Sequence, residues 1–300
     1  MDEADFIAAL RAVAVDPAAR GLADDVAVIG DLVFSHDMIV EGVHYLASDP
    51  PESVAWKLIA VNLSDLAAKG AEPVAALMGY CLTNDDDWDS AFVEGLGIAS
   101  RHFGVPIIGG DTVRLPPGTA RMLGLTVIGR ATGLTPSRSG AGVGDTLFVT
   151  GNIGDAGLGL SIAREGAGDA VLLAAYQRPV PQLAAGRALA GVVTAMMDVS
   201  DGLLIDASRM AVASGVGVRI DLDAVPLSRP YIDTAGATRA ARLAAAVSGD
   251  DYQLLFTSPH PLPTLPLRVT RIGQVVRGSG ISIYDSEGAV PAPNVLGWQH

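Results

Sequence analysis

The candidate functional residues in this sequence are aspartates that lie at the ends of apolar elements or inside them. Their positions are Asp24, Asp25, Asp37, Asp65, Asp111, Asp198, Asp201, Asp250 and Asp251. A buried carboxylate is costly to keep ionised, and several close together repel one another, unless divalent cations lie among their oxygens. Oxygen-only ligand sets favour Mg²⁺, Mn²⁺ or Ca²⁺ over zinc. Because the five histidines and the one cysteine are scattered, the pattern predicts a site for hard divalent cations.

Each of these aspartates also has a purely structural interpretation. An aspartate at a strand end is most often a turn former or a helix N-cap, and for Asp201 capping fits the spacing as well as metal binding does. Asp65 is harder to explain in this way, because aspartate is unfavourable inside a helix. In a helix over 52–69, Asn62, Asp65 and Lys69 share one face, opposite an apolar stripe. Six other aspartates are interpreted as solvated: Asp31, Asp85, Asp86, Asp87, Asp221 and Asp223.

Two short segments place small residues beside carboxylates in a way that suits an anion. GGDT (109–112) and DVSDG (198–202) leave backbone amides able to approach phosphate oxygens. Because the formal charge is −13, binding a polyphosphate requires Mg²⁺ to bridge the like charges. The sequence has no GxxxxGK[ST] phosphate loop, and GNIGDAG (151–157) lacks the spacing of a dinucleotide fingerprint. These features favour nucleotide-dependent phosphoryl transfer, in which positioning and charge neutralisation do most of the catalysis.

Composition excludes several classes of protein. Hydrophobic residues make up 49% of the 300 residues and charged residues 18%, which is unlike a disordered chain. With 33 acidic and 20 basic residues, the chain lacks a footprint for nucleic acid or for an anionic membrane. The single cysteine, Cys81, excludes an internal disulfide. The acidic start lacks the basic region of a signal peptide, and no apolar run is long enough to span a bilayer. We therefore expect a cytoplasmic protein with small-molecule substrates.

Strands and helices alternate along the chain, which predicts an α/β (α+β) fold. Strands are expected at 26–30, 32–36, 74–82, 105–108, 122–129, 146–150, 193–198, 217–222, 252–257, 268–276 and 281–284. Helices are expected at 52–69, 89–102, 155–165, 181–190, 202–213 and 237–246. The segment 131–145 is rich in Gly, Ser, Thr and Pro without a core-building pattern, so we expect two domains, 1–135 and 136–300.

Six segments together resemble the thiamine-monophosphate kinase family, whose superfamily includes aminoimidazole ribonucleotide synthetase and selenophosphate synthetase. They are DMIVEGVHYL (37–46), WKLIAVNLSDLAAKGAEP (56–73), IIGGDT (107–112), LTPSRSGAGVGD (134–145), DVSDGL (198–203) and SGDDYQLLFT (248–257). The NLSDLAAxGAEP and DxxVEGxH elements resemble the kinase more closely than its relatives. The resemblance extends through nearly the whole chain.

This resemblance implies an ATP- and Mg²⁺-dependent kinase that converts thiamine phosphate to thiamine diphosphate. It implies a homodimer in which the sheets of the N-terminal domains pair, with ATP between that ATP/Mg-binding and dimerisation domain and the C-terminal α/β domain. Carried over by motif, the magnesium positions are Asp25, Ser35, His36, Asp37, Asp65, Asp111, Asp198 and Asp201. The ATP contacts are Gly110, Asp111, Arg138 and Ser200. The thiamine phosphate contacts are His44, Asp250 and Trp298. No catalytic base is implied, because the second pKa of the substrate's phosphate is about 6.

The sequence departs from the family pattern at four positions. Ala23 replaces the glycine of a Gly-Asp-Asp motif, and Asp250 and Gln253 replace two glutamates. His36 replaces a threonine at a magnesium position, and a neutral imidazole is a poorer magnesium ligand than a hydroxyl or carbonyl oxygen. Two alternatives remain open at this point: a synthetase of the same superfamily that phosphorylates an amide oxygen, and a non-catalytic nucleotide-binding regulator. His36 and Asp250 would favour the regulator.

Three of the implied contact residues have ordinary interpretations when the family is set aside. His44 fits a core histidine bonded to a backbone carbonyl. Arg138 fits a solvated linker, and Trp298 fits a packing residue near the end of the sequence.

Overall fold

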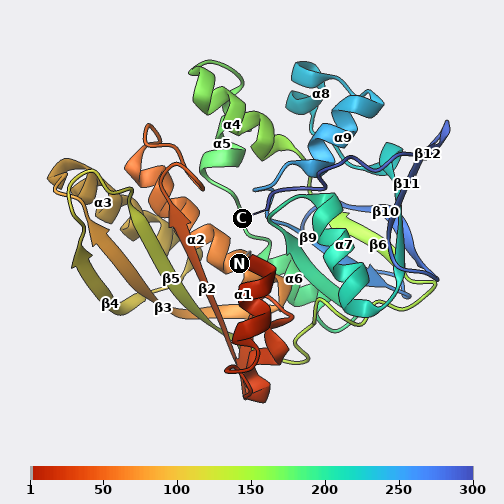
Figure 1. Ribbon diagram of the computed structural model, residues 1–300, viewed down its shortest axis with the longest axis horizontal. Helices are drawn as coiled ribbons and strands as arrows, with labels where there is room; N and C mark the ends of the chain where they lie inside the picture. The colour runs from red at the N-terminus through yellow and green to blue at the C-terminus, as the bar shows by residue number, and fades with distance from the viewer. Residues whose placement is uncertain (1–2, 300) are drawn as a thin grey trace.

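The computed structural model describes residues 3–299 and contains two β-sheets, one from each half of the chain (Figure 1). The first has five strands in the order β1-β2-β5-β3-β4, and the second has seven in the order β12-β11-β8-β10-β6-β9-β7. The strands of the first sheet are β1 (Ala27–Ile29), β2 (Leu32–Val40), β3 (Ala71–Leu82), β4 (Ile107–Arg114) and β5 (Met122–Ala131). Those of the second are β6 (Thr146–Thr150), β7 (Ala195–Val199), β8 (Gly217–Asp221), β9 (Gln253–Ser258), β10 (Val269–Val276), β11 (Gly280–Asp285) and β12 (Gly288–Val290). The predicted mixed fold in both halves is confirmed.

The helices fill the connections between these strands. They are α1 (Glu3–Leu10), α2 (Pro51–Ala68), α3 (Asp86–Phe103), α4 (Asp155–Glu165), α5 (Ala170–Gln177), α6 (Leu183–Leu189), α7 (Leu203–Ser214), α8 (Arg229–Ala235) and α9 (Arg239–Val247), with short 3₁₀ turns at Pro17–Leu22 and Leu222–Ala224. Across residues 3–299, every helix is too short or too polar to cross a lipid bilayer.

The register of the first sheet decides which side chains face α2. On β2, His36 lies opposite Thr126 and Met38 lies opposite Gly124. His36 and Met38 are exposed, whereas Ser35, which precedes His36 along the strand, is buried against α2. Since side chains alternate along a strand, Ser35 and Asp37 share the inner face of the sheet, and His36 and Met38 lie on its outer face.

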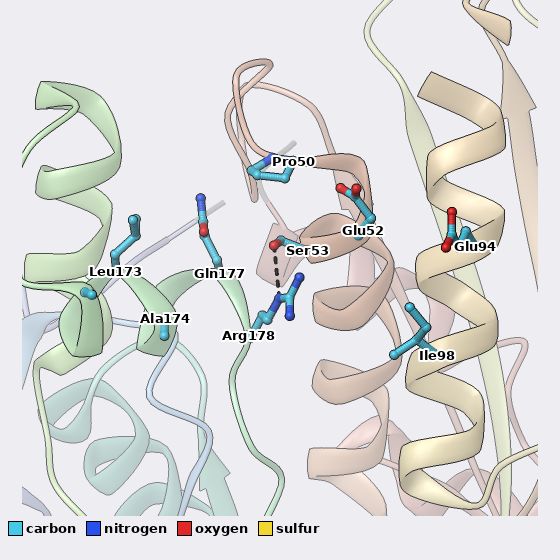
Figure 2. A pocket seen from close by; sticks show the side chains of 10 residues that line it. Pro50, Glu52, Ser53, Glu94, Ile98, Leu173, Ala174, Gln177 and Arg178 are labelled. Atoms are coloured by element: carbon cyan, nitrogen blue, oxygen red, sulfur yellow. Dashed lines mark hydrogen bonds between the residues drawn. The ribbon is translucent and has the colours of Figure 1, made fainter. Parts of the chain in front are cut away.

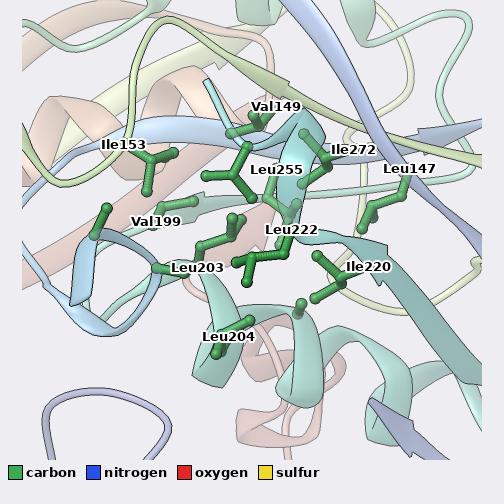
Figure 3. Packing of buried hydrophobic residues seen from close by; sticks show 14 of the residues in the cluster. Leu147, Val149, Ile153, Val199, Leu203, Leu204, Ile220, Leu222, Leu255 and Ile272 are labelled. Atoms are coloured by element: carbon green, nitrogen blue, oxygen red, sulfur yellow. The ribbon is translucent and has the colours of Figure 1, made fainter. Parts of the chain in front are cut away.

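The core of the second half fixes the turn that leads from β7 to α7. Leu147 and Val149 of β6 pack with Leu255 of β9 and with Leu203 and Leu204 at the start of α7 (Figure 3). All five residues of β7 are buried. The segment 200–202 is therefore held between two buried elements.

Helix α2 is buried along almost its entire length between the two halves. Of its 18 residues, only Pro51, Glu52 and Trp56 are not buried. On one side it packs against β2, β3 and β5, and on the other against β7, β9, α5 and α6. The sequence predicted an apolar stripe and a polar face, but both lie in the interior. The buried polar residues of α2 therefore face the second half of the chain or strand β2 of the first sheet rather than water.

The element boundaries differ from the sequence-based expectation mainly around GGDT. The strand expected at 105–108 runs as β4 from Ile107 to Arg114, so Asp111 lies inside a strand instead of ending one. The helices α1, α5 and α8 and the strand β12 were not predicted, because each is eight residues or shorter and has no strong period. Residues 132–145 form neither helix nor strand.

The contact between α6 and α2 generates a stability prediction. A Cβ built on Gly186 would lie 1.9 Å from the carbonyl oxygen of Ala67, so α6 can approach α2 this closely only with glycine there. We expect Gly186→Ala to lower the free energy of unfolding by about 1–3 kcal/mol, as overpacking does. Urea denaturation measures this value. Gly191→Ala is the control, because a Cβ at Gly191 has open space; equal stability of the two variants would contradict the close approach.

Candidate active site

The inner face of β2 meets the C-terminal half of α2 at the centre of the molecule. Ser35 Oγ donates a short hydrogen bond to Asp65 Oδ2. One turn earlier on α2, Asn62 accepts from the backbone N–H of Asp37 at 2.9 Å and donates to the carbonyl of Leu58 at 2.9 Å. Asn62 is therefore a strut between the helix and the strand, and it sets the distance between Asp37 and Asp65.

Two cations from different parts of the chain meet at Asp25. Lys69 Nζ lies 2.7 Å from Asp25 Oδ2 and 2.6 Å from Asp24 Oδ1, and Arg138 bonds to the other oxygen of Asp25. Burial alone would raise the pKa of Asp25, but the charges of Lys69 and Arg138 outweigh it and hold that pKa well below its usual value. Asp25 is thus a fixed negative charge, and Arg138 belongs to this centre instead of a solvated linker.

The second half contributes Asp198, in β7, and Asp201, in the following turn. Asp201 is not the N-cap of α7: Gly202 occupies that position, and no side chain among residues 3–299 caps the helix. Instead the carboxylate of Asp206 accepts from the backbone N–H of Asp201 at 3.1 Å, and Arg209 bonds to both Asp201 and Asp206. The capping interpretation of Asp201 is therefore wrong, and Asp206 is the residue that holds this turn.

These aspartates, together with the hydroxyl of Ser35 that bonds to Asp65, form one unit, which we call the carboxylate cluster. It comprises Asp25, Ser35, Asp37, Asp65, Asp198 and Asp201. Burial, followed by the charges of Asp25 and Asp201, raises the pKa of Asp37 to about 6. Burial and the neighbouring Asp25 raise that of Asp198 to about 8, and burial with Asp37 and Asp198 raises that of Asp65 well above its usual value. Asp37, Asp65 and Asp198 are therefore close enough to neighbouring carboxylates for their ionisation to be disfavoured.

The donor chemistry of the carboxylate cluster fits magnesium. Its oxygens are hard ligands, and the two cations nearby, Lys69 and Arg138, pair with Asp25 and leave Asp37, Asp65 and Asp198 available to a metal ion. Within residues 3–299, however, no three His, Cys, Asp or Glu side chains are arranged to hold one ion by themselves. A Mg²⁺ site does not require three protein ligands, because Mg²⁺ is usually held by one or two carboxylates together with water and substrate phosphates.

The residues expected to contact thiamine phosphate lie beside the cluster. Asp250 donates its backbone N–H to the carbonyl of Ser200 at 2.7 Å, and Trp298 donates its own to the carbonyl of Asp201 at 2.8 Å. Lys57 Nζ bridges the carbonyl of His44, at 2.9 Å, and the carboxylate of Asp250, at 2.8 Å. The structure thus brings four of the predicted contact residues together around the 200–202 turn and Lys57, a residue that the sequence analysis missed.

Three predicted site residues are not brought to the cluster. Gly110 and Asp111 are exposed on β4, the edge strand of the first sheet. The His36 imidazole lies on the outer face of that sheet, where its Nδ1 is 2.9 Å from Thr126 Oγ1. Within this chain these side chains therefore lie away from Asp65, because strand alternation directs His36 to the outer face and two strands separate β4 from β2.

A cavity of about 630 Å³ lies at the other end of α2 (Figure 2). It is bordered by Glu52 at the start of α2, by Glu94 of α3 and by Gln177 near the end of α5. Arg178 donates to Ser53 across it at 3.2 Å. Asp65 and the rest of the carboxylate cluster lie beyond the middle of α2, so this cavity is separate from the chemistry described above.

Known families and individual proteins resemble this chain over most of its length. Residues 23–131 match the family model of the AIR synthase related protein, N-terminal domain, and residues 142–286 match that of its C-terminal domain. The thiamine-monophosphate kinase of Caulobacter vibrioides is 37% identical over 307 residues, which cover 95% of this chain and 86% of the relative. The chain belongs to the thiamine-monophosphate kinase family. The resemblance inferred from the sequence motifs is thereby confirmed.

Other members of the kinase family extend the comparison. The thiamine-monophosphate kinase of Salmonella typhimurium is 36% identical over 252 residues, covering 80% of this chain and 76% of the relative. The solved structure of AaThiL complexed with AMPPCP and TMP has a TM-score of 0.88 at 29% identity and covers 100% of this chain and 97% of its own. That of the kinase from Stenotrophomonas maltophilia has a TM-score of 0.75 at 30% identity and covers 95% and 96%.

The raised pKa values generate a prediction about stability. Each such group favours the folded state while protonated, so its contribution is complete below the ordinary pKa of 3.8 and is lost as pH passes about 6 for Asp37 and about 8 for Asp198. With EDTA present, we expect the melting temperature to fall by several degrees from about pH 5 to about pH 8.5. Calorimetry with and without Mg²⁺ measures this, and Mg²⁺ should stabilise more at the higher pH.

Asp198→Asn is the matched control for this pH dependence. It removes one titrating group with little change in volume, so the fall in melting temperature should become shallower. A metal-free protein whose melting temperature stays constant or rises across this range would refute the mutual repulsion of these carboxylates.

Proposed function

We propose that this chain transfers the γ-phosphoryl group of ATP to the phosphate of thiamine phosphate, giving thiamine diphosphate. The observation that carries the proposal is the carboxylate cluster between the two halves, in a chain that belongs to the thiamine-monophosphate kinase family. The likeness to AaThiL complexed with AMPPCP and TMP supports the choice of both substrates, because that structure covers the whole of this chain.

The reaction places modest demands on the protein. The attacking oxygen belongs to the substrate's own phosphate, which is largely anionic at neutral pH, so no protein base is needed. Several Mg²⁺ ions, when bound, would neutralise the charge on two repelling phosphate groups and on the transferred phosphoryl group. What remains for the chain is to hold both substrates in line and to keep the carboxylates in place.

We assign these tasks to named residues. The magnesium ligands are proposed among Asp25, Ser35, Asp37, Asp65, Asp198 and Asp201. Arg138, whose guanidinium lies at Asp25, and Ser200 are proposed to contact ATP, and His44, Asp250 and Trp298 to contact thiamine phosphate. Residues 1–135 would carry the ATP, metal and dimer functions, and 136–300 the second wall of the site. We also propose a cytoplasmic location, where ATP is available.

Asp65 provides the most direct test of this proposal. Asp65→Asn removes one charge with almost no change in volume, so the fold should be kept and turnover should fall by about 100-fold or more, as for a lost ligand in metal-assisted transfer. Release of ADP and formation of thiamine diphosphate measure turnover, and circular dichroism checks the fold. Near-normal turnover would exclude a metal role for Asp65. Formylglycinamidine ribonucleotide as substrate tests the synthetase alternative in the same assay.

The exposed outer face of the first sheet supports the proposal of a homodimer. Met38, Leu77 and Val113 on this face are 49%, 40% and 49% exposed, and large exposed apolar patches mark interaction sites. Asp111 lies in register with Gly79 on the same sheet, away from the carboxylate cluster of its own chain. We therefore propose that Asp111 serves the site of the second copy.

A hybrid dimer tests this assignment. Asp65→Asn and Asp111→Asn should each be inactive alone, but a heterodimer of the two, purified through two different tags, should regain about half of wild-type activity, because one of its two equivalent sites is intact. A heterodimer as inactive as its parents would place Asp111 in the site of its own chain. A monomeric wild-type protein in sedimentation would contradict the dimer itself.

A further inference from the structure

Lysine is rare in this chain, and its placement is selective. Only two of the 20 basic residues are lysines, Lys57 and Lys69, and both lie on or directly after α2 with side chains 2% and 0% exposed. Lys69 neutralises Asp24 and Asp25 at the carboxylate cluster. Lys57 has no part in the phosphoryl transfer proposed above, although burying its ammonium group is costly unless partners compensate.

The ammonium group of Lys57 has partners on three sides. Its Nζ lies 2.9 Å from the carbonyl oxygen of His44, 2.8 Å from Asp250 Oδ2, and 4.2 Å from the centre of the Tyr176 ring. These partners are far apart in the sequence: one precedes α2, and the other two belong to the second half of the chain. Lys57 is therefore a cross-link between two segments that face the same space.

The first partner belongs to a tightly closed loop. The backbone N–H of Gly42 donates to the carbonyl of Tyr45 at 2.8 Å, and that of Val40 donates to His44 Nδ1 at 3.0 Å. The same loop is tied to α5, because Asp49 accepts from the backbone N–H of Leu46 at 2.8 Å and from Tyr176 Oη at 2.7 Å. Lys57 and Tyr176 thus fix the segment 41–50, Lys57 through the carbonyl of His44 and Tyr176 through the carboxylate of Asp49.

The second partner has an unusual backbone. Asp250 has φ +67° and Tyr252 has φ +48°, a region that residues other than glycine rarely occupy. Such a conformation persists only where the surroundings hold it. Here both carboxylate oxygens of Asp250 are engaged, one by Lys57 and the other by the hydroxyl of Tyr252, which donates to it at 3.0 Å. The contacts with Lys57 and Tyr252 therefore stabilise this strained turn and fix the orientation of the Asp250 carboxylate.

We infer that Lys57 is a positioning residue for thiamine phosphate: it locks the His44 loop to Asp250 and so shapes the substrate's binding surface from both sides. This inference rests on the proposed function. Arginine would not replace lysine here, because its planar fork is wider than an ammonium group and the space is closed by the Tyr176 ring.

Kinetics of Lys57→Met provide the first test. Methionine keeps a similar length of side chain but removes the charge, so we expect the KM for thiamine phosphate to rise by about tenfold or more, with the KM for ATP within twofold, as for the loss of a binding contact. Val61→Ala, one turn further along α2 in the apolar core, is the control and should lower stability without separating the two KM values. An unchanged KM for thiamine phosphate in folded Lys57→Met would overturn the inference.

Chemical labelling provides a second test that needs no activity. An amine-reactive reagent, read out by peptide mass spectrometry, follows both lysines of the native protein at once. We expect Asp250→Asn to speed the labelling of Lys57 by about tenfold and to leave Lys69 unchanged, because only the contact with Asp250 is loosened. Equal labelling of Lys57 in the two proteins would overturn the inference, even if Lys57→Met failed to fold.

The proposed function and the positioning role of Lys57 are refuted by different results. A wild-type protein that forms no thiamine diphosphate would refute the proposed function, while the labelling result would still decide whether Lys57 and Asp250 are coupled. If the wild-type protein is active but Lys57→Met does not raise the KM for thiamine phosphate relative to the KM for ATP, only the positioning role is refuted.

Discussion

Negative charge kept away from water is the constraint on which the site depends. Asp25, Asp37, Asp65 and Asp198 lie within electrostatic reach of one another in the interior. Lys69 and Arg138 both bind Asp25, so the other three carboxylates keep raised pKa values. Ionised carboxylates that lie close together in a protein interior are costly unless protons or cations compensate their charge. The cluster therefore favours the binding of divalent cations. Cations bound there would in turn allow a polyphosphate to bind to an acidic protein.

One helix makes this arrangement possible. Because α2 is buried between both halves, its polar residues at 62, 65 and 69 reach elements from both of them. Asn62 fixes the distance to β2, Asp65 meets Ser35, and Lys69 reaches Asp25 and the carbonyl of Met196. The same helix carries Lys57 in its first half, so the metal ligands and the proposed substrate contacts share a single rigid support.

The sequence allowed the fold class, most long elements and the inner members of the cluster to be predicted. Asp65 could be singled out because aspartate is unfavourable inside a helix. In the structure its side chain is buried. The positions of His36 and Asp111 away from the carboxylate cluster of their own chain could not be predicted, for one physical cause. A motif fixes order along the chain, but the side of a sheet and the strand order depend on pairing between distant segments. Lys57 and Asp206 escaped notice because their partners lie far away or inside a helix turn, and a single lysine between apolar neighbours carries no spacing signal of its own.

The interior position of α2 also bears on how this protein folds. Each sheet is made from a continuous stretch of chain, which would ordinarily allow each half to form alone. Here, however, the first half on its own would expose the side of α2 that packs on β7, β9 and α6, and would leave Lys57 without Asp250. Neither half has a complete interior without the other. Folding of the two sheets should accordingly be cooperative, with the helix between them completed only when both are in place.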